Sequence, residues 1–82
     1  MALYFFHTRT DSRYSDAEGT EFTTATEARA QAIITCGQMM KDAPNSFWGS
    51  RPWSVVVTDA AGLILWELSV DGFASPAALE IQ

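Results

Sequence analysis

One long helix is the only extended helix that this sequence predicts, and it restricts the folds open to the chain. Thr24 and Glu27 form a capping box, in which each side chain bonds the backbone N–H of the other residue at a helix start. Pro44 ends the helix because proline lacks an N–H and disfavours helical geometry in the residue before it. The sequence therefore predicts a helix from Thr24 to Ala43.

The predicted helix carries its apolar residues on one side. They recur at steps of three and four residues, which is the spacing of a single helix face. The members of this apolar stripe are Ala25, Ala28, Ala32, Ile33, Cys36, Met39, Met40 and Ala43. Because Cys36 lies within the stripe, we expect its thiol to be buried and unreactive.

The other apolar segments have the character of strands. Leu3 to Arg9 is short and aromatic, and Thr20 to Phe22 adds a shorter strand before the helix. Trp53 to Thr58 and Leu63 to Val70 flank residues 59–62, whose Asp and Gly suit a hairpin turn. This order, β-(β)-α-β-β, predicts an α+β fold with the helix packed on a three- to four-stranded antiparallel or mixed sheet. The first strand could neighbour either strand of the hairpin.

Two registers are open to the predicted hairpin. A four-residue loop pairs Val57 with Ile64, whereas a three-residue loop with a bulge at Gly62 pairs Val57 with Leu65. We favour the first register because it gathers a wholly apolar face. That face consists of Trp53, Val55, Val57, Ile64, Trp66 and Leu68.

The length and ends of the chain indicate one small domain. Its 82 residues fit a single domain over residues 1–82, in which residues 71–82 form a tail. Ser75 and Pro76 predict a short helical turn in that tail, with Ser as the N-cap and Pro at the first helical position.

Composition excludes several classes of partner. The net charge is −5 and the five basic residues are scattered, so we expect no nucleic-acid binding. No apolar run reaches the length of a membrane span, and no basic segment followed by an apolar run marks a targeting signal. A single cysteine makes no internal disulfide. We therefore expect a cytoplasmic protein that does not bind membranes.

The sequence contains no motif of a known catalytic site, and we predict that the protein is not an enzyme and needs no metal or cofactor. His7 is the only imidazole, and we expect it to serve as a structural residue at a strand end. The alternative is a small-ligand or metal site that uses His7 with the acidic loop at residues 11–19 or with Phe47 and Trp48.

Apolar residues on both faces of the sheet predict an interaction surface. One helix covers only one face, which leaves an expected interaction face of Leu3, Phe5, Val56, Leu63 and Leu65. The leading hypothesis is therefore a non-catalytic interaction or regulatory module that forms a homodimer, with a further protein as a second kind of partner. The competing explanation is that the segment from Phe73 to Ile81 folds across this face.

Four motifs in this order resemble a family of small bacterial domains of unknown function. The motifs are Tyr4-Phe5-Phe6-His7, Asp16-x-Glu18-Gly19-x-Glu21-Phe22, Ala28-Arg29-x-x-Ala32 and Trp53-x-Val55-x-Val57-x-Asp59-x-x-Gly62. Such domains are frequent in alphaproteobacteria, and the resemblance covers roughly residues 3 to 70. In place of the family's usual Asp-Gly after the first strand, this chain has Thr10-Asp11-Ser12. The resemblance implies the same fold and a bacterial cytoplasmic setting, and it carries over no catalytic residues.

Overall fold

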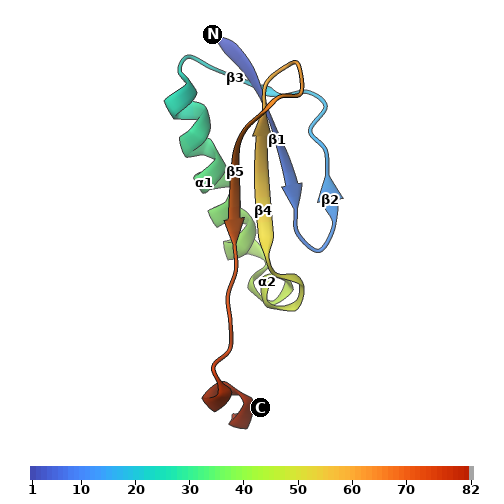
Figure 1. The fold of residues 1–82 in the computed structure, drawn as a ribbon, viewed down its shortest axis with the longest axis vertical. Coiled ribbons are helices and arrows are strands. Elements are labelled where there is room, and N and C mark those ends of the chain that lie inside the picture. The colour runs from blue at the N-terminus through green and yellow to red at the C-terminus, as the bar shows by residue number, and fades with distance from the viewer. Residues whose placement is uncertain (82) are drawn as a thin grey trace.

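A computed structural model describes residues 1–81 and shows a long helix packed against an antiparallel sheet (Figure 1). In chain order the elements are β1 (Ala2–Arg9), β2 (Arg13–Tyr14), β3 (Thr20–Phe22), α1 (Ala25–Asp42), α2 (Pro44–Ser50), β4 (Trp53–Thr58), β5 (Ile64–Val70) and a 3-10 turn, η1 (Pro76–Glu80). The predicted α+β fold is confirmed. The capping box is also confirmed, since Thr24 accepts the Glu27 N–H and Glu27 accepts the Thr24 N–H.

Within residues 1–81, the strands form one sheet with the order β2-β1-β4-β5, and β3 also pairs with β1. All pairings are antiparallel, and β1 neighbours β4, the first strand of the hairpin. β2 and β3 pair with the two ends of β1 on the side away from β4. β5 is therefore the outermost strand at the other edge of the sheet.

The core forms where α1 lies on β4. Ala28 and Ala32 of α1 are buried with Val55 and Val57 of β4, because small side chains let the helix approach the sheet closely. Cys36 belongs to the same buried cluster, as expected. On the side of α1 away from this contact, nothing lies within 4 Å of the position that a Gly37 side chain would occupy.

Ile33 lies outside the core, although the stripe predicted it inside. Its side chain is 59% exposed. Gln31 and Thr35 face a cleft beside β1. Two residues along a helix correspond to a rotation of about 200° around its axis, so Ile33 lies nearly opposite both of them. Ile33 therefore lies on the side of α1 that turns toward β5.

The favoured hairpin register is wrong by two residues. Val57 pairs with Trp66 and Thr58 pairs with Ile64, so Leu65 is an extra residue in β5 at a bulge. From Trp66 onward a shift of two residues keeps each side chain on its predicted face, and Trp66 still packs against the core. Ile64, by contrast, is 61% exposed.

The hairpin turn explains why the two strands join in this way. The Asp59 carboxylate accepts the N–H groups of Ala61 and Leu63, both at 2.9 Å. The Asp59 N–H in turn donates to the Leu63 carbonyl. Gly62 adopts a positive φ of 87°, a conformation that glycine adopts without a steric penalty. These bonds close the turn tightly at its base, and the extra residue is taken up in β5.

Residues 44–50 form a second, shorter helix, α2. Pro44 occupies the first turn of this helix, where the missing N–H removes no helical bond. Phe47 is buried, and its ring packs edge-to-face on that of Trp53 with their centroids 5.6 Å apart. Pro44 therefore ends one helix and starts the next.

The C-terminal residues beyond β5 do not cover the sheet. The chain runs on past Val70 and away from the folded body, and η1 lies at its far end (Figure 1). Phe73 is 83% exposed, and Leu79 and Ile81 are also exposed. The expectation that this segment folds across the outer face of the sheet is therefore wrong. Residues 71–81 are called the C-terminal arm below.

We predict that Cys36 reacts with a thiol reagent many times more slowly in the native protein than in denaturant. Burial raises the pKa of the thiol, so little thiolate forms, and the reagent reaches it only when the chain opens. The measurement is the labelling rate with a chromogenic disulfide at neutral pH, with and without urea. Equal rates in the two conditions would show that Cys36 lies outside the core.

Candidate functional site

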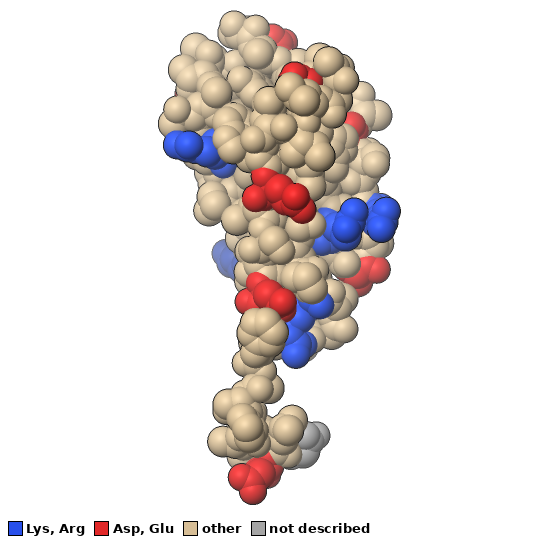
Figure 2. Space-filling view, viewed as in Figure 1, with Lys and Arg blue, Asp and Glu red and all other residues tan. Residues whose placement is uncertain are grey.

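The outer face of the sheet, opposite α1, is the surface that the sequence predicts for interaction. Because side chains alternate along a strand, Phe5, His7 and Val56 lie on this face while Phe6 and Val57 face the helix. In the view of Figures 1 and 2 the sheet lies in front of α1. Charged groups are scattered over this side, with uncharged surface between them (Figure 2).

The expected interaction face is brought together only in part. Leu3 is exposed at the start of β1, and Phe5 and Val56 are half-buried. Leu63 is 64% exposed in the hairpin turn. Leu65, which forms the bulge, packs against the core and does not contribute to the outer face as expected.

Part of the outer face is covered by the loop that joins β2 to β3. A side-chain carbon added at Gly19 would lie 3.0 Å from Leu3 Cγ and from Phe5 Cε2. Gly19 also has a positive φ of 76°. Only glycine fits this close approach without strain, so the loop shields one end of the face and leaves the region around Val56 open.

Asp16 joins this loop to β1 by taking the place of a strand residue. β3 pairs with residues 2–4 of β1 and β2 pairs with residues 8–9, so neither strand reaches Phe6. The Asp16 Oδ2 accepts the Phe6 N–H at 3.1 Å, and Oδ1 accepts the N–H groups of Glu18 and Gly19, both at 3.1 Å. One carboxylate therefore bridges the gap between two short strands.

His7 is held between this loop and β4. Its Nδ1 accepts the Asp16 N–H at 3.1 Å, so in the neutral ring Nε2 carries the proton and donates to the Thr58 hydroxyl at 3.1 Å. Both ring nitrogens thus have partners within the fold. This geometry is that of the structural histidine we expect, and it gives little support to a ligand or metal site at His7.

The three backbone N–H groups determine the protonation of Asp16. Burial alone would raise the pKa of this carboxyl, but the bonds from Gly19, Phe6 and Glu18, aided by the nearby His7, hold the pKa below its usual value. A carboxylate with a lowered pKa stabilises the fold at pH values above the pKa of the unfolded chain, about 3.9. That contribution is lost as the pH falls through the lower pKa of the folded state.

We predict that Asp16→Asn lowers the stability by about 1 kcal/mol at pH 7, because an amide nitrogen cannot accept the N–H groups that the carboxylate binds. The difference from the wild type should shrink as the pH falls below about 4, where the wild-type carboxyl becomes protonated. Urea midpoints at pH 7, 5 and 3 measure this. Asp11→Asn, in the exposed loop nearby, is the control and should change little. A pH-independent difference at Asp16 would contradict the assignment.

A cleft of about 640 Å³ lies between α1 and the strands β2 and β3. No sequence pattern indicated this cleft, because it forms between segments whose relative placement is not visible in a pattern. Phe6 and Phe22 contribute apolar surface, and Gln31 and Thr35 line the helix side, where the Gln31 amide donates to the Thr35 hydroxyl. Within residues 1–81 its polar lining consists of Thr and Tyr hydroxyls, the Gln31 amide and the carboxylates of Asp16 and Glu18, with no His, Cys, Ser or Lys among them.

Phe47 and Trp48, the other expected ligand-binding residues, lie at the opposite end of β4 from the hairpin turn. Phe47 is buried, whereas Trp48 packs on Gly72, where an added side-chain carbon would meet the ring at 3.0 Å. Arg51 lies over the Trp48 ring, with 5.2 Å from its guanidinium carbon to the ring centroid. The structure does not bring these aromatic residues to His7.

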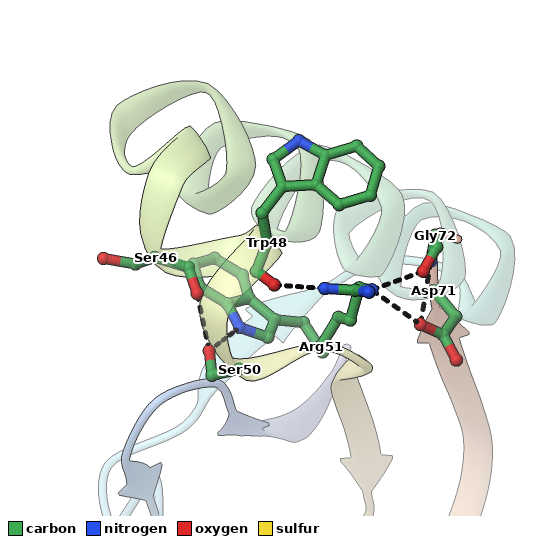
Figure 3. Close-up of polar contacts among 7 residues, drawn as sticks. Ser46, Trp48, Ser50, Arg51, Asp71 and Gly72 are labelled. Carbon is green, nitrogen blue, oxygen red and sulfur yellow. Dashed lines mark hydrogen bonds and ion pairs between the residues drawn. The ribbon is translucent and has the colours of Figure 1, made fainter. Parts of the chain in front are cut away.

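Arg51 fixes the start of the C-terminal arm (Figure 3). Its Nε donates to the Gly72 carbonyl and its Nη1 donates to the Trp48 carbonyl. The Asp71 carboxylate lies 4.0 Å from Nε. The arm therefore leaves the body in a direction set by α2 and continues the course of β5. The only sequence signal for this contact is that Arg51 stands between a short apolar segment and a proline. That arrangement is too common in proteins to predict a contact.

Two further classes of site find no support. Within residues 1–81, no group of three or more His, Cys, Asp or Glu side chains is placed to hold a metal ion. No helix in the same range has the length and apolarity needed to cross a bilayer.

Comparison with known proteins identifies the family. No curated protein and no solved structure matches the chain. A family model described as "Domain of unknown function (DUF6894)" matches residues 3–71. Within residues 1–81 this match includes α1, α2 and all strands of the sheet, apart from Ala2, the first residue of β1. The match ends where the C-terminal arm begins. The resemblance to a family of domains of unknown function is thus confirmed, and the chain belongs to the family DUF6894.

Proposed function

We propose that this domain is a non-catalytic protein-interaction module that acts as a homodimer. The observation that carries the proposal is that a single helix covers one face of the sheet, while the C-terminal arm projects away and leaves the outer face open. A chain of 82 residues buries a smaller share of its surface than a larger domain, so it gains much from association.

The chemistry of the described residues favours binding over catalysis. His7 has both nitrogens in use, Cys36 is buried, and the residues that line the cleft beside α1 include no His, Cys, Ser or Lys. Apolar side chains, in contrast, are exposed at the hairpin turn, on α1 and along the arm. Exposed apolar groups on a small domain favour a protein partner.

A bacterial cytoplasmic setting fits the same interpretation. The one thiol is buried in the core and forms no disulfide, which agrees with a reducing compartment. In that setting the outer face around Val56 would serve as the surface for a second protein, and self-association would place two such faces in one assembly.

We predict that the purified protein is a dimer at tens of micromolar, the range in which a weak dimer is populated. Light scattering coupled to size exclusion should give twice the 9.0 kDa mass of the chain. Each subunit carries a net charge of −5, so the two subunits repel each other, and salt screens this repulsion. Raising the salt from about 0.05 to 0.5 M should therefore not dissociate the dimer. A mass of one chain at every concentration and salt would refute the proposal.

A further inference from the structure

We propose that two copies join through the free edge of β5, so that their sheets become one continuous antiparallel sheet. This inference rests on the proposed homodimer and names the surface that forms it. β5 is the outermost strand at its edge, and within residues 1–81 it pairs only with β4. Natural sheets usually protect an edge of this kind, because its backbone groups are a template for another strand.

The direction of the backbone groups in β1 follows from one hydrogen bond. The Phe6 N–H donates to Asp16 on the side of β1 away from β4. Backbone groups alternate between the two sides of an antiparallel strand, so His7 directs its N–H and C=O toward β4. His7 pairs with Val56, and these two residues therefore exchange backbone bonds.

The same alternation extends from Val56 to the free edge. Val55 and Val57, on either side of Val56, therefore direct their backbone groups to β5. Val57 pairs with Trp66 there, and Val55 pairs with Leu68. Glu67 and Ser69, which alternate with these two, therefore direct their N–H and C=O groups outward. The bulge lies at the start of β5, so the strand from Trp66 to its end is regular.

Charge distinguishes the three registers of two β5 strands that are centred on Glu67, Leu68 or Ser69. Pairing centred on Glu67 would place two Glu67 carboxylates opposite each other, and pairing centred on Ser69 would place Glu67 opposite Asp71. Like charges directly opposite one another destabilise a strand pair. Centring on Leu68 places Glu67 opposite Ser69 of the second copy and brings the two Leu68 residues together. No like charges face each other across β5 in this register.

The selected register also places exposed apolar residues together. In this register Phe73, at the start of the arm, lies toward the hairpin turn of the second copy, which carries Leu63. These side chains are 83% and 64% exposed in the single chain. Arg51 holds the carbonyl of Gly72 toward its own chain, which is the side that the alternation along β5 requires.

The helices allow the same arrangement. A two-fold axis perpendicular to the sheet places both copies of α1 on one side, with the flanks that turn toward β5 facing each other. Ile33 is exposed on this flank. Gly37 follows one turn later and has open space beside it, so two helices can approach there without a side-chain clash.

The first experiment tests the register by cross-linking. Leu68 and its copy would form a pair without backbone bonds between them, with Cα atoms about 4.5 Å apart, a separation that a disulfide spans. Leu68→Cys should therefore give a cross-linked dimer under mild oxidation on a non-reducing gel. Ser69→Cys is the matched control, since its copies lie beyond disulfide range in this register. Cross-linking at Ser69 but not at Leu68 would overturn the register.

The second experiment tests the interface by charge exchange, with circular dichroism to verify folding. Ser69→Glu places a carboxylate opposite Glu67 of the second copy at two symmetric points, and should raise the Kd of the dimer roughly tenfold. Adding Glu67→Lys should restore the dimer, and Ser69→Ala should leave it unchanged. Ser69 and Glu67 are both exposed, so the monomer fold should tolerate these changes.

A third variant separates this inference from the proposed function. Leu3→Asp alters the outer face far from the β5 edge and should leave the dimer intact. A wild-type dimer that Leu3→Asp dissociates and Ser69→Glu does not would overturn edge pairing while supporting the homodimer. A wild-type monomer would overturn the homodimer itself.

Discussion

The contact between the small residues of α1 and the valines of β4 is the interaction on which the rest of the structure depends. Ala28 and Ala32 let the helix lie close to Val55 and Val57, and this contact buries the central strand from one side. A helix about 10 Å wide covers only part of a sheet of this width. With α1 packed on β4, residues 1–81 contain no second helix of comparable length for the outer face, and β5 remains at an edge.

Much of the fold could be predicted because its signals are local. The capping box at Thr24 and the proline at position 44 define the long helix within the sequence itself. The period of two in the hairpin strands assigns Trp66 to the helix side even though the predicted register was wrong. The bulge at Leu65 could not be foreseen, since it depends on how the Asp59 side chain closes the turn. Pro44 was interpreted only as a stop, although proline suits a first helical turn equally well.

The candidate sites were less predictable because they depend on the placement of distant segments. Asp16 is one of several acids in its loop, and only the pairing of β2 and β3 with β1 shows that its carboxylate fills the gap at Phe6. The structural role of His7 could be anticipated from its isolation, but not its partners. The free edge of β5 was not visible, because the sequence left the order of the strands undecided.

The two edges of this sheet differ in kind, and the difference bears on how large an assembly can grow. At the β1 side the edge is divided into strands of two and three residues, with a carboxylate in place of backbone between them. Such an edge offers no continuous template, whereas β5 offers seven residues. A sheet with two open edges can add subunits without end and form a fibre. A sheet with one open edge has no free edge left after the first pairing. Under the proposed edge pairing, Asp16, on the far side of the molecule from β5, would therefore limit the assembly to two copies.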